Sequence, residues 1–219
     1  MMHMNDFAGL IKSRRSIRKW QDKPVPEQML IDAIELGTWA PNSGNRQNWR
    51  FYIILNKDTV KEIAAAWEAG ASSMPYRTDS PQSSGTTPGS HFTPGMLLTT
   101  APAMIAVGTK QMPNPLEKAI ASGALTDSRA ARMQEWTNTL DVRIQSVSAA
   151  IAYLLLALHQ MGLGALWMTG PLRLCKGDVE GVLKTPSDMD IIALIPVGYP
   201  AESPSGKRKA VNEVCEIIH

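Results

Sequence analysis

The sequence predicts a single folded domain that combines α-helices with short β-strands. Its 219 residues fit the size of one domain, and 44% hydrophobic against 19% charged residues are ordinary values for a globular chain. Segments in which apolar residues recur with helical spacing are interspersed with short apolar runs that are typical of strands. The sequence contains no internal repeat, so we expect one domain over residues 1–219.

Charge and apolar patterning exclude several classes of partner. The formal net charge of +2 provides no broad field for binding nucleic acid or an anionic membrane. The longest apolar run, Ala149 to Leu158, is about half the roughly 20 residues that a transmembrane helix requires. The amino terminus carries no signal-peptide pattern. We therefore expect no membrane partner and no export.

Cysteine and histidine usage argues against a metal site. Cys175 and Cys215 do not form a C-x-x-C pair, and the four histidines have no ligand spacing. A reducing compartment fits this composition, and we expect the protein to be cytoplasmic.

The first elements expected are two helices. A short helix is predicted around residues 7–11, capped by Asn5 or Asp6. A second helix is predicted to begin at Pro26 and to end before Pro41, because the residue before proline avoids the helical region.

A polar loop at 41–48 is then expected to lead into a strand at 49–55. Asp58 is the predicted cap of the next helix. Residues 70–95 are rich in Ser, Thr, Gly and Pro and predict a long loop insertion. Such loops are usually functional lids or disordered segments, and the sequence does not choose between the two.

The second half contains a strongly apolar helix. Residues 128–161 predict one or two helices, and the part from Val147 onward must be enclosed by its own domain or by a second subunit. Further strands are predicted at 103–109, at 165–168 and within 190–199. After Pro200 a basic stretch and alternating apolar residues predict a tail anchored against something, for which the partner subunit is one candidate.

Arg14, Arg15, Ser16 and Arg18 form a cluster that suits a phosphate. Guanidinium groups bind phosphate oxygens bidentately, and a serine hydroxyl adds a neutral hydrogen bond. The alternative is a solvated basic turn, which composition alone favours because short basic runs are common.

A second polar cluster comprises Asn42, Ser43 and Gln47. Side-chain amides donate and accept hydrogen bonds at once, which fits the uracil-like edge of a flavin. The alternative is a turn that satisfies its own backbone, and for this cluster alone that alternative is the more common case.

No recognisable acid, base, nucleophile or metal set is present. The glycines at 162 and 164 follow a predicted helix instead of a strand, so they do not indicate a dinucleotide-binding fold. An organic cofactor is therefore the expected carrier of any chemistry.

In sequence order, the motifs resemble the nitroreductase family. They are Arg14-Arg15-Ser16-Ile17-Arg18, Ala40-Pro41-Asn42-Ser43, Gln47-Asn48-Trp49, Gly162-Leu163-Gly164, Trp167-x-x-Gly170 and Val197-Gly198-Tyr199-Pro200. The resemblance implies an α+β fold with a central mixed β-sheet flanked by helices. It also implies an intertwined homodimer with FMN bound at the subunit interface.

The resemblance assigns FMN-binding roles to individual positions of this sequence. It implies phosphate and ribityl contacts from Arg14, Ser16 and Arg18, with Arg15 as a neighbouring contact. It also implies ring contacts from Asn42, Ser43 and Gln47, a backbone N–H near flavin N5 from Met168-Thr169-Gly170, and phosphate contacts from Lys207 and Arg208. The sequence departs from the family pattern at Asn48, where proline is common, at Gly206, where a basic residue is expected, and in the insertion at 70–95.

The implied reaction is ping-pong. NADH or NADPH reduces FMN and leaves, and a nitroaromatic, quinone or similar small electrophile then takes the electrons at the same flavin face. Alternatives are a specialised flavin reaction, such as reductive dehalogenation or flavin destruction, and a non-catalytic module that binds an anion or flavin.

Overall fold

The structure is a computed structural model that describes residues 4–72, 94–111, 115–124, 132, 135–136, 139–170 and 172–218. Its centre is a four-stranded sheet in the order β1-β2-β4-β3. The strands are β1 (Trp49–Ile54), β2 (Ala103–Lys110), β3 (Gly164–Ala165) and β4 (Met189–Gly198). All of these strands were predicted within a few residues, apart from β3, which is shorter than expected.

The strands pair antiparallel throughout, with Trp49 opposite Thr109 and Ala103 opposite Val197. Among the described residues, the parallel component expected of a mixed sheet is a single bridge between Ser16 and Ala165. The α+β class is confirmed, and the mixed character of the sheet is limited to this bridge.

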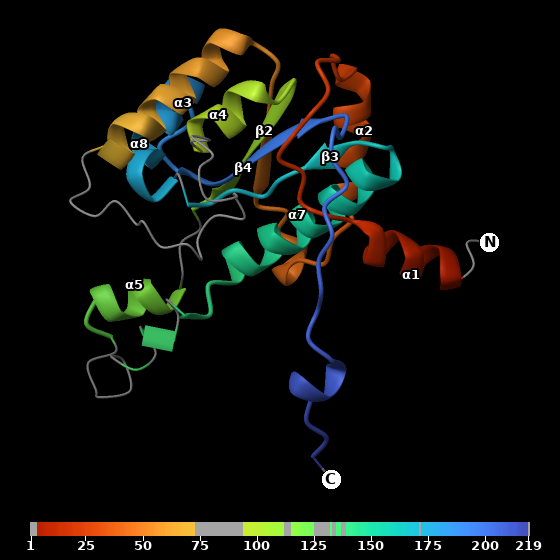
Figure 1. Cartoon of the computed structure of the whole chain (residues 1–219). Helices are drawn as coiled ribbons and strands as arrows, with labels where there is room; N and C mark the ends of the chain where they lie inside the picture. Colours follow the sequence, from red (N-terminus) through yellow and green to blue (C-terminus); the bar gives the residue numbers. More distant parts are fainter. Residues whose placement is uncertain are drawn as a thin grey trace.

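One face of the sheet is covered by α2 (Glu27–Thr38) and α7 (Val142–Gln160), with α1 (Met4–Ser13) packed on the latter (Figure 1). The core on this face takes alternate residues of β2 and β4, such as Ile105 and Ile195. Gly37 of α2 permits a close approach to α7, because a Cβ there would lie 3.3 Å from the Cβ of Leu154.

The other face is covered by α3 (Lys57–Ser72), α4 (Pro94–Thr100) and α8 (Leu172–Leu183), which lie together in Figure 1. The intervening strand residues, such as Met104 and Leu194, point to this face, as the two-residue period of a strand requires. The sequence did not predict α8, which contains two glycines.

By length and composition α7 could cross a membrane, and its 19 residues have a mean hydropathy of 1.4. Its inner side, however, packs into the core with Val147, Ile151, Leu154 and Leu158. We therefore assign α7 as a core helix, as expected from the sequence.

Several predicted boundaries were wrong. Asn5 and Asp6, predicted to precede the first helix, lie inside α1, which begins at Met4. The side-chain oxygen of Asn56, not Asp58, accepts the amide hydrogens of residues 58 and 59 at the start of α3. The expected loop at 70–95 is helical at both ends, since α3 reaches residue 72 and α4 starts at residue 94, and residues 73–93 lie outside the described chain.

The C-terminal segment leaves the body of the molecule and carries a short helix, η2 (Val211–Glu213) (Figure 1). Its apolar side chains are exposed, with 68% of Val214, 78% of Ile217 and 92% of Ile218 accessible. None of the described residues covers these side chains. Two further described helices are η1 (Ser43–Asn45), which precedes β1, and α5 (Pro115–Ala121), which follows β2.

Candidate functional site

Arg14, Arg15 and Arg208 form an arginine cluster beside the C-terminal end of α7. Arg14 and Arg15 follow α1 directly, and Arg208 approaches from the C-terminal segment. A Cβ placed on Gly206 would lie 3.7 Å from Nη1 of Arg208 and 3.8 Å from Nε of Arg15, so both guanidinium groups border this glycine.

The cluster has no anionic partner among the described residues, whose ion pairs all involve other cations. Arg15 donates through Nη1 to the carbonyls of Lys12 and Arg14, but its buried Nε has no hydrogen-bond partner within the part of the chain that the structure describes. Burial, followed by the charges of Arg208 and Arg15, lowers the pKa of Arg14 below its ordinary value. A buried donor and mutually repelling cations are the features of a site that is completed by an anion.

The backbone around Ser16 is fixed by β3. Ser16 forms the parallel bridge with Ala165, and the amide of Ile17 donates to the carbonyl of Ala165 at 3.1 Å. Gly164 makes this approach possible, because a Cβ there would lie 2.5 Å from Cγ1 of Ile17. Gly164, the second glycine of the Gly162-Leu163-Gly164 motif, therefore allows the arginine segment to pack closely against the sheet.

The other predicted phosphate contacts are Arg18 and Lys207. The amides of Arg18 and Lys19 donate to Oε1 of Glu202, which fixes the backbone there. Lys207 is exposed, and its carbonyl accepts from Nη1 of Arg208. Among the described residues, no side-chain hydrogen bond joins Arg18 or Lys207 to Arg14 or Arg15.

The polar loop after α2 is held largely by its own side chains. Oδ1 of Asn42 accepts from the amide of Gln47 at 3.0 Å, and Nε2 of Gln47 donates to Oδ1 of Asn45 at 3.1 Å. Gly44, Asn45 and Gln47 have positive φ angles of 62°, 51° and 47°. The loop thus satisfies part of its own backbone, as the alternative interpretation predicted, while the side chain of Ser43 stays exposed.

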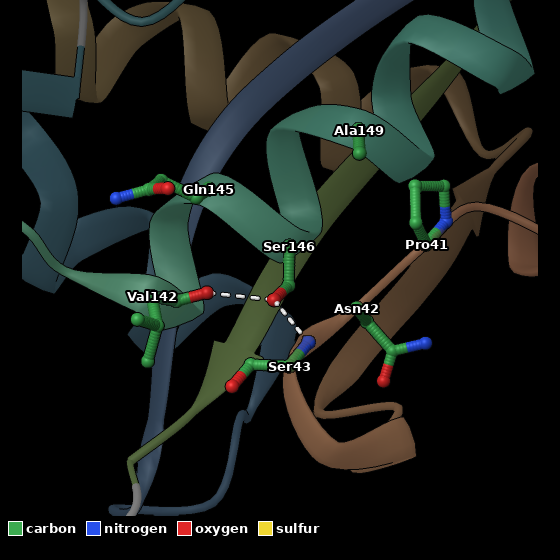
Figure 2. A pocket seen from close by; sticks show the side chains of 7 residues that line it. All are labelled: Pro41, Asn42, Ser43, Val142, Gln145, Ser146 and Ala149. Atoms are coloured by element: carbon green, nitrogen blue, oxygen red, sulfur yellow. Dashed lines mark hydrogen bonds between the residues drawn. The ribbon is translucent and has the colours of Figure 1, made fainter.

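The loop is anchored at two points. Nδ2 of the buried Asn48 donates to Oγ1 of the buried Thr109 at 2.7 Å, which ties the loop to the end of β2. Oγ of Ser146 in α7 accepts a hydrogen bond from the amide of Ser43 at 3.2 Å and donates one to the carbonyl of Val142 at 2.6 Å (Figure 2).

An open pocket of about 360 Å³ lies between this loop and the first turns of α7 (Figure 2). Its lining comprises Pro41, Asn42, Ser43, Val142, Gln145, Ser146 and Ala149. The loop residues were predicted, and those of α7 were missed.

The start of α7 is fixed by paired charges. Asp141 caps the helix by accepting from the amides of Arg143 and Ile144. Arg143 pairs with Asp141 at 2.9 Å and with Asp190 of β4 at 3.2 Å, and Lys176 of α8 reaches Asp190 at 2.8 Å. Burial alone would raise the pKa of Asp190, but hydrogen bonds from Lys176 and Gln111 and the pairing with Arg143 lower it below its ordinary value.

The segment 168–170 follows β3 and is only partly free to bind a ligand. The amide and carbonyl of Met168 are both bonded to Leu194 at 2.9 Å. Thr169 and Gly170 are exposed, and in the described part of the chain their amides make no backbone hydrogen bond. Of the three predicted residues, only Thr169 and Gly170 can present an N–H to a ligand.

Residues 11–199 match the nitroreductase family. The chain belongs to the nitroreductase family. This confirms the predicted family, and the protein is an oxidoreductase enzyme of the nitroreductase type.

Two curated relatives align with most of the chain. An NADH dehydrogenase of Thermus thermophilus is 28% identical and aligns with 86% of this chain and 84% of its own length. An iodotyrosine deiodinase of Thermotoga neapolitana is 26% identical, with 90% of each chain covered.

Solved structures share the fold at low identity. A BluB-like flavoprotein of Clostridium difficile 630 has a TM-score of 0.78 at 22% identity, with 100% of both chains covered. An FMN-dependent nitroreductase of Clostridium difficile R20291 has a TM-score of 0.66 at 20% identity, covering 97% of this chain and 99% of the other. These neighbours confirm the nitroreductase-like α+β fold.

Proposed function

We propose that this nitroreductase binds FMN and transfers hydride from NADH or NADPH, through the flavin, to a small electrophilic acceptor. The observation that carries the proposal is the arginine cluster, which has no anionic partner in the described chain and includes a buried, unpartnered Nε on Arg15. Guanidinium groups bind a terminal phosphate bidentately. FMN differs from riboflavin by such a phosphate, which makes FMN an anionic ligand. The residues present therefore fit FMN.

The ring is proposed to lie on the loop at 42–47 and against the amides of Thr169 and Gly170. FMN, when bound, supplies the hydride chemistry. An N–H donor held beside N5 favours the reduced form by preorganised electrostatics. The pocket between the loop and α7 has room for planar ligands, and one pocket is sufficient when NAD(P)H and the acceptor bind in turn.

We propose that two copies of the chain form the site. Ser146, which anchors the loop, and His159, which lies beside the arginine cluster, are separated along α7 by about 20 Å. The phosphate and the uracil-like edge of one FMN lie much closer together than that. A homodimer brings the arginine cluster of one protomer to the loop of its partner.

The exposed C-terminal apolar residues support the same assembly. Replacing Ile217 with Asp is expected to convert the dimer to monomers and to release FMN, because a buried carboxylate at the interface is strongly unfavourable. Light scattering after size-exclusion chromatography measures this. Glu216→Lys is the control, since it changes a neighbouring charge without removing apolar contact. A dimer that survives Ile217→Asp unchanged contradicts the proposed role of the tail.

Anaerobic spectroscopy tests the proposed reaction. Addition of NADH or NADPH is expected to bleach the bound flavin, and a nitroaromatic or quinone is expected to restore its colour. A flavin that neither nicotinamide reduces would overturn the proposal. The same experiment gives the preference between NADH and NADPH.

Reductive dehalogenation is a second candidate, because an iodotyrosine deiodinase is among the relatives. Halide release from a halogenated phenol, measured with reduced flavin, distinguishes this activity from nitro or quinone reduction. Product analysis of the flavin itself tests the third possibility, flavin destruction. We also propose a cytoplasmic location, supported by Cys175 and Cys215, which are not joined in a disulfide.

A further inference from the structure

His159, on the last turn of α7, contacts the segment that carries the arginine cluster. Its Nε2 is 2.8 Å from Oγ of Ser13, the last residue of α1, and Arg14 follows directly. The proposed function makes no use of this side chain.

The charges that lower the pKa of the His159 ring are both positive. In the described part of the chain, the charged groups that act on His159 are Arg14 and Arg15, and Arg208 in turn acts on Arg14. No carboxylate from α2, β2 or β3, which also pack against α7, belongs to this set. Burial, then Arg14 and Arg15, lower the pKa of His159 from its ordinary value of 6.5, so the ring is neutral at neutral pH.

We propose that His159 is a member of the phosphate site and takes up a proton from solvent when FMN binds. This rests on the proposed binding of FMN. The phosphate dianion cancels the field that Arg14 and Arg15 exert on the ring, and the C-terminal end of α7 favours a cation there. The added proton sits on the imidazole, and the hydroxyl of Ser13 accepts a hydrogen bond from Nε2–H.

The direction of the pH dependence follows from this coupling. The FMN-bound protein holds the proton more tightly than the free protein, so FMN affinity rises as pH falls toward the titration range of the free ring. The second ionisation of the FMN phosphate, near pH ~6, acts in the opposite direction. That contribution is the same for every variant and cancels in a ratio.

The test is FMN titration by flavin fluorescence between pH 6 and 8, on the wild type and on His159→Gln. Gln reaches toward Ser13 with a group that can hydrogen-bond but does not titrate. Relative to His159→Gln, wild-type affinity is expected to weaken about threefold to tenfold as pH rises, since one linked proton changes affinity at most tenfold per pH unit. Parallel curves for the two proteins would overturn the inference.

Calorimetry gives a second readout. FMN binding by the wild type and by His159→Gln at pH 7, measured in two phosphate-free buffers of different ionisation enthalpy, is expected to show more proton uptake for the wild type, because the phosphate contribution is common to both proteins. Equal proton uptake by the two proteins would overturn the role of His159, even with FMN bound tightly. Failure of the wild type to bind FMN at all would instead overturn the proposed function, and this inference with it.

Discussion

The two ends of α7 differ in how their charges are compensated. At its start, Asp141, Arg143, Asp190 and Lys176 are paired with one another at 2.8 to 3.2 Å. At its end, Arg14, Arg15 and Arg208 lie together without a carboxylate from the described chain. Arg14 and Arg15 are partly buried, as are Asp141 and Arg143, so exposure to water does not explain the difference.

This contrast separates a structural cluster from a binding site. At the start of α7 each of these charges has an oppositely charged partner within the folded chain, and the pairs fix α7 to β4 and α8. The arginine cluster is incomplete and carries a cost in the free protein, which an anionic ligand removes. The comparison predicts that substitutions at the start of α7 change stability, whereas substitutions at its end change FMN affinity.

The largest effect is expected for Arg14→Ala. Loss of a charge-assisted bond to phosphate should weaken FMN binding by about 10- to 100-fold, because such bonds contribute about 1.5–3 kcal/mol. The apo protein should unfold at the same or a higher temperature, since repulsion within the cluster is relieved. Fluorescence titration and calorimetry measure the two quantities. Unchanged FMN affinity would identify the cluster as a solvated turn.

Gly164→Ala tests how β3 positions the cluster. The new methyl group would clash with Ile17, so we expect a loss of about 1–3 kcal/mol in the free energy of unfolding together with weaker FMN binding. Gly181→Ala in α8 is the matched control, because a Cβ there meets no atom within 4 Å. It should be neutral or slightly stabilising. Equal unfolding midpoints for the two variants would contradict the role of Gly164.

Asp190→Asn is expected to reverse the pattern seen with Arg14. Removing the carboxylate takes one ion-pair partner from Arg143 and one from Lys176. The free energy of unfolding should therefore fall by about 1–3 kcal/mol. FMN affinity should change less than twofold. Asp58→Ala, in an exposed pair with Lys61, should leave the unfolding temperature unchanged. A large loss of FMN binding in Asp190→Asn would remove the distinction between the two ends.

The Asp190 effect should depend on pH. The folded pKa of Asp190 lies below its ordinary value, so the stabilisation is complete above the unfolded pKa, near ~3.9, and is lost as pH falls through the folded value. Urea unfolding of the wild type and Asp190→Asn should therefore converge below pH ~4. A difference that stays constant down to pH ~2 would show that the carboxylate charge is not responsible.

The smallest effect is expected for Arg208→Ala. Its guanidinium is exposed, so solvent screens its charge, and FMN affinity should fall only about twofold to fivefold. The same titration used for Arg14→Ala measures it. A loss larger than that of Arg14→Ala would move the centre of the site to the C-terminal segment.

The sequence predicted what local patterns encode. Strand positions, the apolar core helix and the arginine segment follow from periodicity and composition. The ordered series of short motifs indicated the family. Gly164 belonged to a recognised motif, but its role depends on contact with Ile17, which is distant in sequence.

The rest depends on tertiary contacts that carry little local signal. Helix α8 has weak helical propensity and is stabilised by packing against α3 and β4. Asn48 departs from the family pattern, and only the fold reveals its bond to the buried Thr109. Ser146 and His159 likewise read as ordinary residues of an apolar helix until the fold brings Ser43 and Ser13 to them.

Comparing FMN with riboflavin on the wild type and Arg14→Ala tests the central claim most directly, because the two ligands differ only in the phosphate. The wild type is expected to bind FMN at least about 10-fold more tightly than riboflavin, and Arg14→Ala to lose most of that preference. Equal affinity of the wild type for both ligands would contradict the assignment of the arginine cluster as the phosphate site.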